Sequence, residues 1–252
     1  MTLDAVRPGH KGPALHSAAA VIPAAGQGRR MGGETAKQFL PLRGLPILVH
    51  TLRVFEAAAC ITEVVLVVAE EQVAAAQRDI VEAYGLCKVG RVVAGGDERQ
   101  DSVYLGLQAL VGRTDLVVVH DAARPLLTPD QLDAAVATAA AVGPLVVAVP
   151  VKDTVKVVDP AGVILETPDR RRLWAAQTPQ IFPLNMLLAA HETARRDAYV
   201  GTDDASLVER LGQTVQVLLG SPENLKVTTP EDLLLAERIL ERRAAAGAGR
   251  RD

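Results

Sequence analysis

In AAAVIPAAGQGRRMG, residues 18–32, a short apolar run passes directly into a turn of small residues. The run at 19–22 is continuous rather than alternating, as is typical of a strand covered on both faces in a parallel sheet. Small residues after such a strand let backbone N–H groups approach phosphate oxygens closely. We therefore expect a phosphate-binding turn, with a merely tight turn as the alternative.

The spacing of the glycines excludes two common phosphate motifs. No Gly-Lys-Ser/Thr follows the turn, so it is not a P-loop. Gly26-x-Gly28 is followed by Met31 where a dinucleotide fingerprint needs its third glycine. The turn instead carries Arg29 and Arg30, and Lys37 follows downstream. These cations favour a nucleoside triphosphate as the ligand.

Further apolar runs alternate with segments of helical period, which is the signature of βαβ units. We predict an α/β fold, Rossmann-like, with a mostly parallel sheet flanked by helices. Residues 18–242 form a single predicted domain, between a flexible N-terminal extension at 1–17 and a flexible tail at 243–252. The predicted strands are 19–22, 64–69, 89–94, 116–120, 145–150 and 214–219, and helices are predicted from Pro46, near Arg99, from Pro129 with Thr128 as its cap, over 184–197 and 203–211, and from Pro230.

The pattern changes after Pro150. Residues 151–166 form two extended pieces around the turn Asp159-Pro160-Ala161-Gly162. Because an isolated hairpin is marginal in water, a hairpin inserted here is a candidate dimerisation arm, at about 151–173.

Composition excludes several classes of function. The net charge is −3 and aromatic residues make up 3%, so we expect no nucleic-acid partner. No apolar run is long enough to span a bilayer, so no membrane partner is expected either. Cys60 and Cys87 lie far apart, which argues against a disulfide framework or a zinc site. Reduced thiols favour the cytoplasm.

Seven sequence blocks occur in order: PAAGQGRRM (23–31) with Lys37-Gln38, GGDERQDSV (95–103), HDAARP (120–125), PVKDT (150–154), WAAQTPQ (174–180), TDDAS (202–206) and NLKVT (224–228). With these blocks the chain resembles the nucleotidyltransferases that make CDP-linked products. It is most similar to the 2-C-methyl-D-erythritol 4-phosphate cytidylyltransferase family of the non-mevalonate isoprenoid pathway. The resemblance covers about residues 18–240 and implies the nucleotide-diphospho-sugar transferase type of fold.

The resemblance implies a reaction and the residues on its nucleotide side. CMP would pass from CTP to 2-C-methyl-D-erythritol 4-phosphate, with Mg²⁺ or another divalent cation, giving 4-diphosphocytidyl-2-C-methyl-D-erythritol and pyrophosphate. Arg30 and Lys37 would hold the triphosphate. Asp121 would lie at the catalytic centre near the ribose and Mg²⁺, with Arg124 close by. The remaining nucleotide-binding residues implied are Ala24, Ala25, Gly26, Gly28, Gly96, Asp97, Ser102 and Ala122.

The resemblance also implies an acceptor side. Thr178, Thr202 and Lys226 would bind the methylerythritol phosphate, with Lys226 on its phosphate group. Thr154 and Arg170 would reach from the arm into the site of a partner subunit, which implies a homodimer. Arg170, Arg171 and Arg172 are consecutive, so the choice among these three stays open.

The chemistry fits a chain without a recognisable general base. The attacking phosphate is already an anion, and no Ser-His-Asp set, HExxH or G-x-S-x-G occurs. Two polyanions must instead be brought together by fixed cations. Three alternatives remain open: a ribitol 5-phosphate cytidylyltransferase, a hexose-1-phosphate nucleotidyltransferase that uses UTP or TTP, and a nucleotide-binding module without turnover.

Overall fold

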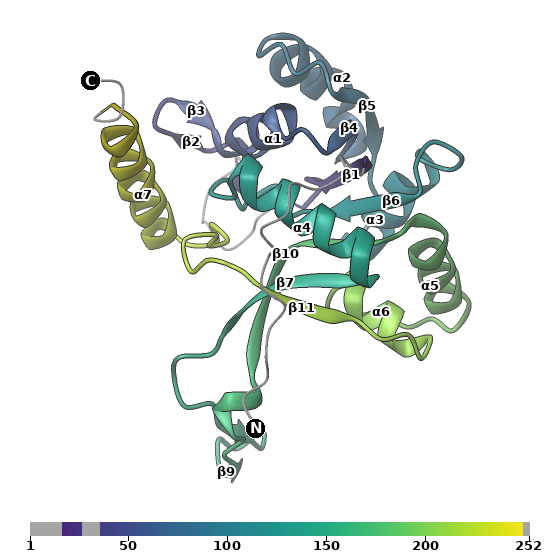
Figure 1. Cartoon of the computed structure of the whole chain (residues 1–252), viewed down its shortest axis with the longest axis vertical. Helices are drawn as coiled ribbons and strands as arrows, with labels where there is room; N and C mark the ends of the chain where they lie inside the picture. Colours follow the sequence, from purple (N-terminus) through teal and green to yellow (C-terminus); the bar gives the residue numbers. More distant parts are fainter. Residues whose placement is uncertain (1–16, 27–35, 249–252) are drawn as a thin grey trace.

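The computed structural model describes residues 17–26 and 36–248. Its central sheet contains β1 (Ala18–Pro23), β4 (Ile61–Val68), β5 (Val89–Ala94), β6 (Leu116–Val119), β7 (Leu145–Pro150), β10 (Trp174–Pro183) and β11 (Gln216–Leu219). The order of this seven-stranded sheet is β11-β7-β10-β6-β1-β4-β5 (Figure 1). Only β10 runs antiparallel to its neighbours, β6 and β7. The predicted mostly parallel α/β sheet is confirmed.

Helices cover both faces of the sheet. The sequence of β1 is apolar throughout because its side chains are buried on both faces. Ala18, Ala20 and Ile22 pack in one core with α1, α2 and α4, whereas Ala19 and Val21 pack in the other with α3, α5 and α6. None of the helices in the described ranges is both long and apolar enough to cross a bilayer. The helices are α1 (Ile47–Ala57), α2 (Val73–Ala76), which continues as a π-helix over Gln77–Glu82, α3 (Arg99–Gln108), α4 (Pro129–Val142), α5 (Leu184–Arg196), α6 (Asp204–Arg210) and α7 (Pro230–Ala248).

The strand β10 was not predicted, because its middle is polar. Gln177, Thr178 and Gln180 are buried in this strand at 6%, 4% and 1% exposure. Each finds a hydrogen-bond partner from a distant segment, on Asn224, His120 and Asp203 respectively. These hydrogen bonds satisfy polar groups that would otherwise be unfavourable in the core. The sequence of the strand alone does not reveal which distant residues supply them.

The closing helix α7 extends further than the sequence predicted. Residues 243–248 belong to this helix, whereas they were assigned to a flexible tail at 243–252 from the sequence. Arg243 stabilises this part of the helix by donating to the Leu126 carbonyl at 2.8 Å and pairing with Glu223 at 2.9 Å. Farther back, α7 packs against the small hairpin of β2 (Pro41–Leu42) and β3 (Leu45–Pro46) through a third apolar cluster, formed by Leu42, Ile47, Leu126, Val227, Ala236 and Ile239.

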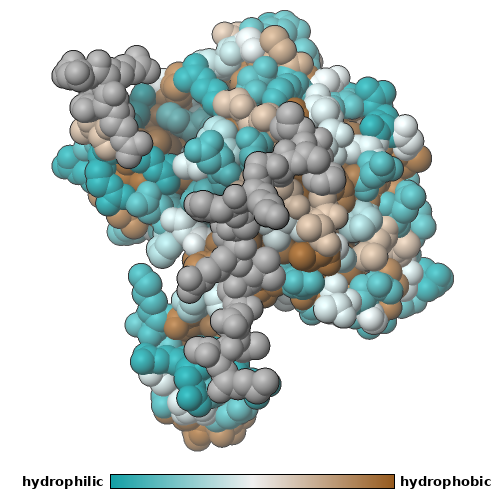
Figure 2. Space-filling model, viewed as in Figure 1, coloured by the Kyte–Doolittle hydropathy of each residue, from teal (hydrophilic) through white to brown (hydrophobic). Residues whose placement is uncertain are grey.

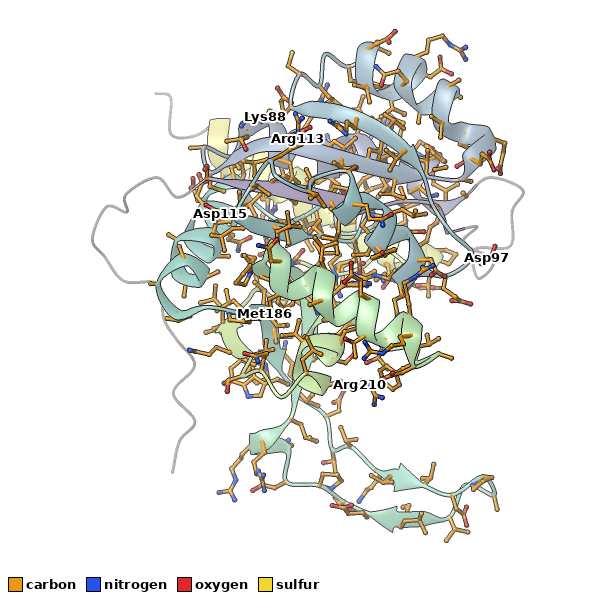
Figure 3. All side chains as sticks on the ribbon, turned by 90° about the vertical axis from the view of Figure 1, so that its right-hand side faces the viewer. Lys88, Asp97, Arg113, Asp115, Met186 and Arg210 are labelled. Atoms are coloured by element: carbon orange, nitrogen blue, oxygen red, sulfur yellow. The ribbon has the colours of Figure 1, made fainter. Side chains whose placement is uncertain are left out.

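Residues 151–173, the arm, join β7 to β10 and stand away from the sheet (Figures 1 and 3). The arm contains the antiparallel pair β8 (Val157–Val158) and β9 (Ile164–Glu166), followed by a 3₁₀ turn over Arg170–Arg172. The predicted turn is present, since the Gly162 N–H donates to the Asp159 carbonyl at 3.0 Å. Hydrophobic surface gathers at the far end of the arm (Figure 2), and its exposed apolar residues are Val155, Val157, Val158, Val163, Ile164 and Leu165.

The predicted cap of α4 gives a test of local stability. Thr128 Oγ1 accepts from the Gln131 N–H at 3.3 Å, and Gln131 Oε1 accepts from the Thr128 N–H at 3.1 Å. Replacing Thr128 with alanine removes one half of this capping box, and we expect a loss of about 1 kcal/mol of unfolding free energy, measured by urea denaturation.

Thr138→Ala is the matched control, because Thr138 lies inside the same helix and its hydroxyl donates to the Ala134 carbonyl at 2.8 Å. Alanine suits a helix interior, so this change is expected to be close to neutral. Equal losses for both variants would contradict the capping role.

Candidate active site

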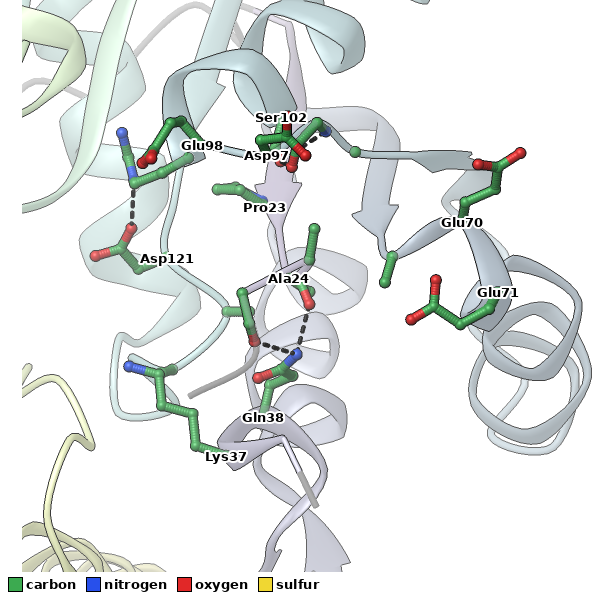
Figure 4. A pocket seen from close by; sticks show the side chains of 18 of the residues that line it. Pro23, Ala24, Lys37, Gln38, Glu70, Glu71, Asp97, Glu98, Ser102 and Asp121 are labelled. Carbon is green, nitrogen blue, oxygen red and sulfur yellow. Dashed lines mark hydrogen bonds and ion pairs between the residues drawn. The ribbon is translucent and has the colours of Figure 1, made fainter. Parts of the chain in front are cut away.

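A cavity of about 770 Å³ opens at the carboxyl ends of the adjacent strands β6, β1, β4 and β5 (Figure 4). Ala24 follows β1, Ala69 follows β4, Gly95 follows β5 and Asp121 lies just after β6. The chain continues from β1 to β4 on one side and later adds β6 on the other, so β1 marks a switch point of the sheet. Ligands of open α/β sheets bind at such points. The volume also lies within the ~300–1,000 Å³ usual for ligand pockets.

The structure brings most of the predicted nucleotide residues to this cavity. Thr202 is exposed and does not line it, and neither do Arg124 and Thr178. Thr154 and Arg170 lie on the arm and do not line it either. Gly28 and Arg30 lie outside the described residues. The predicted residues that line the cavity are Ala24, Ala25, Gly26, Lys37, Gly96, Asp97, Ser102, Asp121, Ala122 and Lys226.

Gln38 fixes the start of the glycine-rich turn. It lies in a 3₁₀ turn over Lys37–Phe39 and is buried at 3% exposure. Its side-chain amide donates to the Ala24 carbonyl at 2.5 Å and to the Gly26 carbonyl at 3.2 Å. The amide thus ties the segment that carries Lys37 to the end of β1 (Figure 4).

The wall formed after β5 requires glycine. A Cβ on Gly95 would lie 2.6 Å from Ser102 Oγ and 2.7 Å from the Cβ of Ala25, and one on Gly96 would lie 2.5 Å from the Cβ of Asp101. Ser102 Oγ accepts from the Gly96 N–H at 3.2 Å. The backbone therefore packs closely here and leaves the cavity open.

A cluster of charged side chains surrounds Asp121. Its Oδ1 lies 3.1 Å from Arg99 Nε, and its Oδ2 lies 2.8 Å from Lys226 Nζ and 3.7 Å from Arg124 Nε. Burial disfavours the charged carboxylate, yet Arg99, Lys226 and Arg124 hold the pKa of Asp121 below its usual range. Asp121 is therefore ionised at neutral pH. Three cationic side chains meet this one carboxylate. The excess of positive charge favours an anionic ligand.

His120 and Thr178 support this cluster from inside the protein. Thr178 Oγ1 accepts from the Asp121 N–H at 3.1 Å and is 3.0 Å from His120 Nδ1. His120 Nε2 lies 3.1 Å from the Arg124 carbonyl, and burial lowers the pKa of His120 to about 4. The ring is neutral and both its nitrogens are hydrogen-bonded. Thr178 was predicted to bind the acceptor, and this stays a prediction; in this structure its hydroxyl accepts from the backbone N–H of Asp121.

The two ends of the cavity differ in charge. Lys37 lies on one side, together with Asp121 and its paired cations Arg99 and Lys226, whereas Glu70 and Glu71 lie on another (Figure 4). A polyphosphate fits the side of Lys37 and Lys226, because carboxylates repel it. In the described parts of the chain, no three His, Cys, Asp or Glu side chains gather in a way that could hold a metal ion by themselves.

Sequence reasoning did not assign a role to Arg99, Gln38 or Asp204. All three lie inside or next to the quoted blocks, so the signal was present. Their roles depend on contacts between segments that are far apart in sequence, such as the ion pair from Arg99 to Asp204.

Residues 18–242 match the family model described as 2-C-methyl-D-erythritol 4-phosphate cytidylyltransferase (IspD). The chain belongs to this family. The enzyme of that name from Pelotomaculum thermopropionicum is 50% identical over 229 residues, which are 91% of this chain and 96% of the relative. The one from Symbiobacterium thermophilum is 52% identical over 235 residues, 93% of this chain and 98% of the relative.

Solved structures of the family share the fold. The 4-diphosphocytidyl-2C-methyl-D-erythritol synthase from Anaerococcus prevotii superposes with a TM-score of 0.78 at 28% identity, covering 90% of this chain and 100% of the other. The 2-C-methyl-D-erythritol 4-phosphate cytidylyltransferase from Thermus thermophilus gives 0.71 at 32% identity, covering 88% and 98%. The family resemblance inferred from the sequence blocks is confirmed.

Proposed function

We propose that this chain transfers CMP from CTP to 2-C-methyl-D-erythritol 4-phosphate, giving 4-diphosphocytidyl-2-C-methyl-D-erythritol and pyrophosphate. Membership of the IspD family supports the two substrates. The observation that carries the proposal is the cavity itself, in which Lys37 and Lys226 accompany Asp121. This arrangement suits two phosphorylated reactants.

In the proposed reaction, an oxygen of the acceptor phosphate attacks the α-phosphorus of CTP. The new P–O bond forms as the bond to the oxygen that bridges to the β-phosphate breaks, and pyrophosphate leaves with that electron pair. Since the nucleophile is already an anion, no side chain has to remove a proton. Lys37 and Lys226 lower the barrier by bringing the two anions together and stabilising charge on the phosphoryl oxygens.

We propose Mg²⁺ as the cofactor, bound together with the triphosphate. Mg²⁺ commonly takes one or two carboxylates and fills its other positions with phosphate oxygens and water. Asp121, a buried carboxylate on the cavity wall, fits the role of the protein ligand. When bound, the ion would neutralise part of the phosphate charge.

We also propose that the chain acts as a homodimer in the cytoplasm, with the arm as the contact. Ile164 and Leu165 on the arm are 57% and 66% exposed. Exposed apolar surface of this kind marks a site of protein contact. Arg170 donates to the Lys152 carbonyl at 3.0 Å, on the arm rather than at its own cavity. The free cysteines Cys60 and Cys87 agree with a reducing compartment.

A direct assay tests the reaction. Purified protein with CTP, Mg²⁺ and 2-C-methyl-D-erythritol 4-phosphate is expected to release pyrophosphate and form the CDP-linked product. Ribitol 5-phosphate is assayed in parallel as acceptor, and UTP and TTP as nucleotides. A higher kcat/KM with ribitol 5-phosphate, or with UTP, would overturn the proposal. Tight CTP binding without pyrophosphate release would instead indicate a binding module.

The close packing at Gly95 leads to a prediction about CTP. In Gly95→Ala, the new Cβ would lie within 2.6 Å of Ser102 Oγ and 2.7 Å of the Cβ of Ala25, so the two walls of the cavity must move apart. We expect the KM for CTP to rise by about tenfold or more, measured by initial rates at saturating acceptor.

Gly90→Ala is the control on the same strand. The three atoms nearest to its Cβ would all belong to the side chain of Glu63, the closest being Oε1 at 3.0 Å, and Glu63 does not line the cavity. A KM for CTP that rises equally in both variants would show that loss of glycine in β5, rather than contact at the cavity, causes the change.

A further inference from the structure

The first turn of α3 is bound to a distant part of the chain by three successive residues. Arg99 Nη1 lies 2.8 Å from Asp204 Oδ2. The Gln100 side chain donates to the Tyr199 carbonyl at 3.0 Å and accepts from the Gly201 N–H at 2.9 Å. Asp101 Oδ1 accepts from Arg195 at 2.8 Å. We call this set of contacts, between residues 99–101 and 195–204, the α3 clasp.

Arg99 is the member of the clasp that reaches the cavity. It lines the cavity, and its Nε lies 3.1 Å from Asp121 Oδ1 (the dashed line at Asp121 in Figure 4). One planar guanidinium thus bridges Asp121 on the cavity wall and Asp204 inside the protein. A guanidinium fork holds a fixed geometry between two such partners, which an ammonium group cannot reproduce.

Burial disfavours the charged form of Asp204, and Arg99, together with a hydrogen bond from His191, holds its pKa below the usual range. It is exposed at 1% and does not line the cavity. Its Oδ1 accepts from His191 Nε2 at 3.2 Å, and His191 is fully buried against the Tyr104 ring. The contact with Arg99 is an ion pair rather than an aligned hydrogen bond, since Asp204 Oδ2 has no hydrogen-bond donor aligned on it. Burying a charged carboxylate costs free energy unless an opposite charge lies beside it. For Asp204 that opposite charge is Arg99.

We propose that Arg99 is a positioning residue: anchored by Asp204 and the α3 clasp, it holds Asp121 Oδ1 and so presents Oδ2 to Lys226. Without this anchor, the carboxylate of Asp121 is free to rotate, and its Oδ2 no longer holds Lys226 Nζ in one position. The inference deepens the proposed function and rests on it for the kinetic readout. The geometry itself does not depend on the reaction.

A double-mutant cycle separates positioning from mere stability. Asp204→Asn keeps the shape of the side chain and lies outside the cavity. We expect it to lower kcat about tenfold in the wild-type background while the Kd for CTP changes less than twofold. In an Arg99→Met background, where the bridge is already absent, Asp204→Asn should change kcat less than twofold. An equal factor in both backgrounds, or a wild-type kcat for Asp204→Asn, would overturn the proposal.

Three further variants keep the test independent of folding. Arg99→Met removes the arginine that pairs with Asp204, so the thermal unfolding of each variant is measured first. Gln100→Ala leaves both carboxylates paired but weakens the clasp, and we expect a roughly threefold lower kcat. Gln108→Ala lies on the same helix, and the Gln108 side chain donates to the Tyr104 hydroxyl rather than to the clasp, so this variant should match the wild type. Arg99→Lys should lose nearly as much activity as Arg99→Met; full rescue by lysine would show that charge alone suffices.

A crystal structure of Asp204→Asn gives a readout that needs no turnover. We expect the contact between Arg99 Nε and Asp121 Oδ1, 3.1 Å here, to be lost. An unchanged contact overturns the proposal even if the enzyme is active. Conversely, if the wild-type protein released no pyrophosphate, the proposed function would be refuted. The crystal structure of Asp204→Asn would still decide whether Asp204 holds Arg99 against Asp121.

Discussion

Replacing Lys226 with methionine should lower kcat/KM for CMP transfer by about 10²–10³, the usual cost of losing one group that stabilises a developing charge. Lys226 lines the cavity, and its Nζ lies 2.8 Å from Asp121 Oδ2. Methionine keeps the apolar length of the side chain and removes only the charge. Asp121 stays paired with Arg99 and Arg124, so no buried carboxylate is left alone and the fold should persist. Steady-state rates with both substrates varied, beside a thermal unfolding curve, measure the effect.

Arg238→Gln is the matched control for this variant. It also removes one cation from an ion pair, with Glu241 at 2.8 Å, but on α7 and at 81% side-chain exposure. Exposed pairs of this kind contribute little, so activity within about twofold of the wild type is expected. If Lys226→Met also retained this activity, the cation beside Asp121 would have no part in catalysis.

The fold was largely predictable because its apolar pattern is local. Ala18, Ala20 and Ile22 face one core, and Ala19 and Val21 face the other. A strand that is buried on both faces has a continuous apolar sequence, which can be recognised without the structure. The strand β10 escaped prediction for the opposite reason. Its buried Gln177 and Gln180 are satisfied by partners on segments that only the folded chain brings near.

The candidate site divides in the same way. Lys37 and Asp121 could be predicted from sequence blocks, and the cavity brings them together. Thr178 shows what the blocks could not reveal, because its hydroxyl is occupied by His120 and the Asp121 backbone. A short motif records which residues are present, but the direction of each side chain depends on its tertiary neighbours.

The arm gives the second large prediction, a site shared between two subunits. Arg170→Ala and Lys37→Ala should each lower the rate by about 10²–10³ when present in both subunits. Co-expressed in equal amounts, they should recover about a quarter of the wild-type rate, because half of the dimers are mixed and one of their two sites is intact. That site combines the cavity of the Arg170→Ala chain with the arm of the Lys37→Ala chain. Differently tagged subunits allow the mixed dimers to be isolated and assayed.

Arg171→Ala is the control in the same 3₁₀ turn, because Arg171 is already held by Asp169 at 2.6 Å. It should leave the rate nearly unchanged. Arg172→Ala decides whether Arg172, rather than Arg170, reaches across. Isolated mixed dimers without recovered activity would mean that each arm serves its own cavity or none. In a mixed dimer, neither chain carries both Lys37 and Arg170. Recovered activity therefore requires that the arm of one chain reach the cavity of the other.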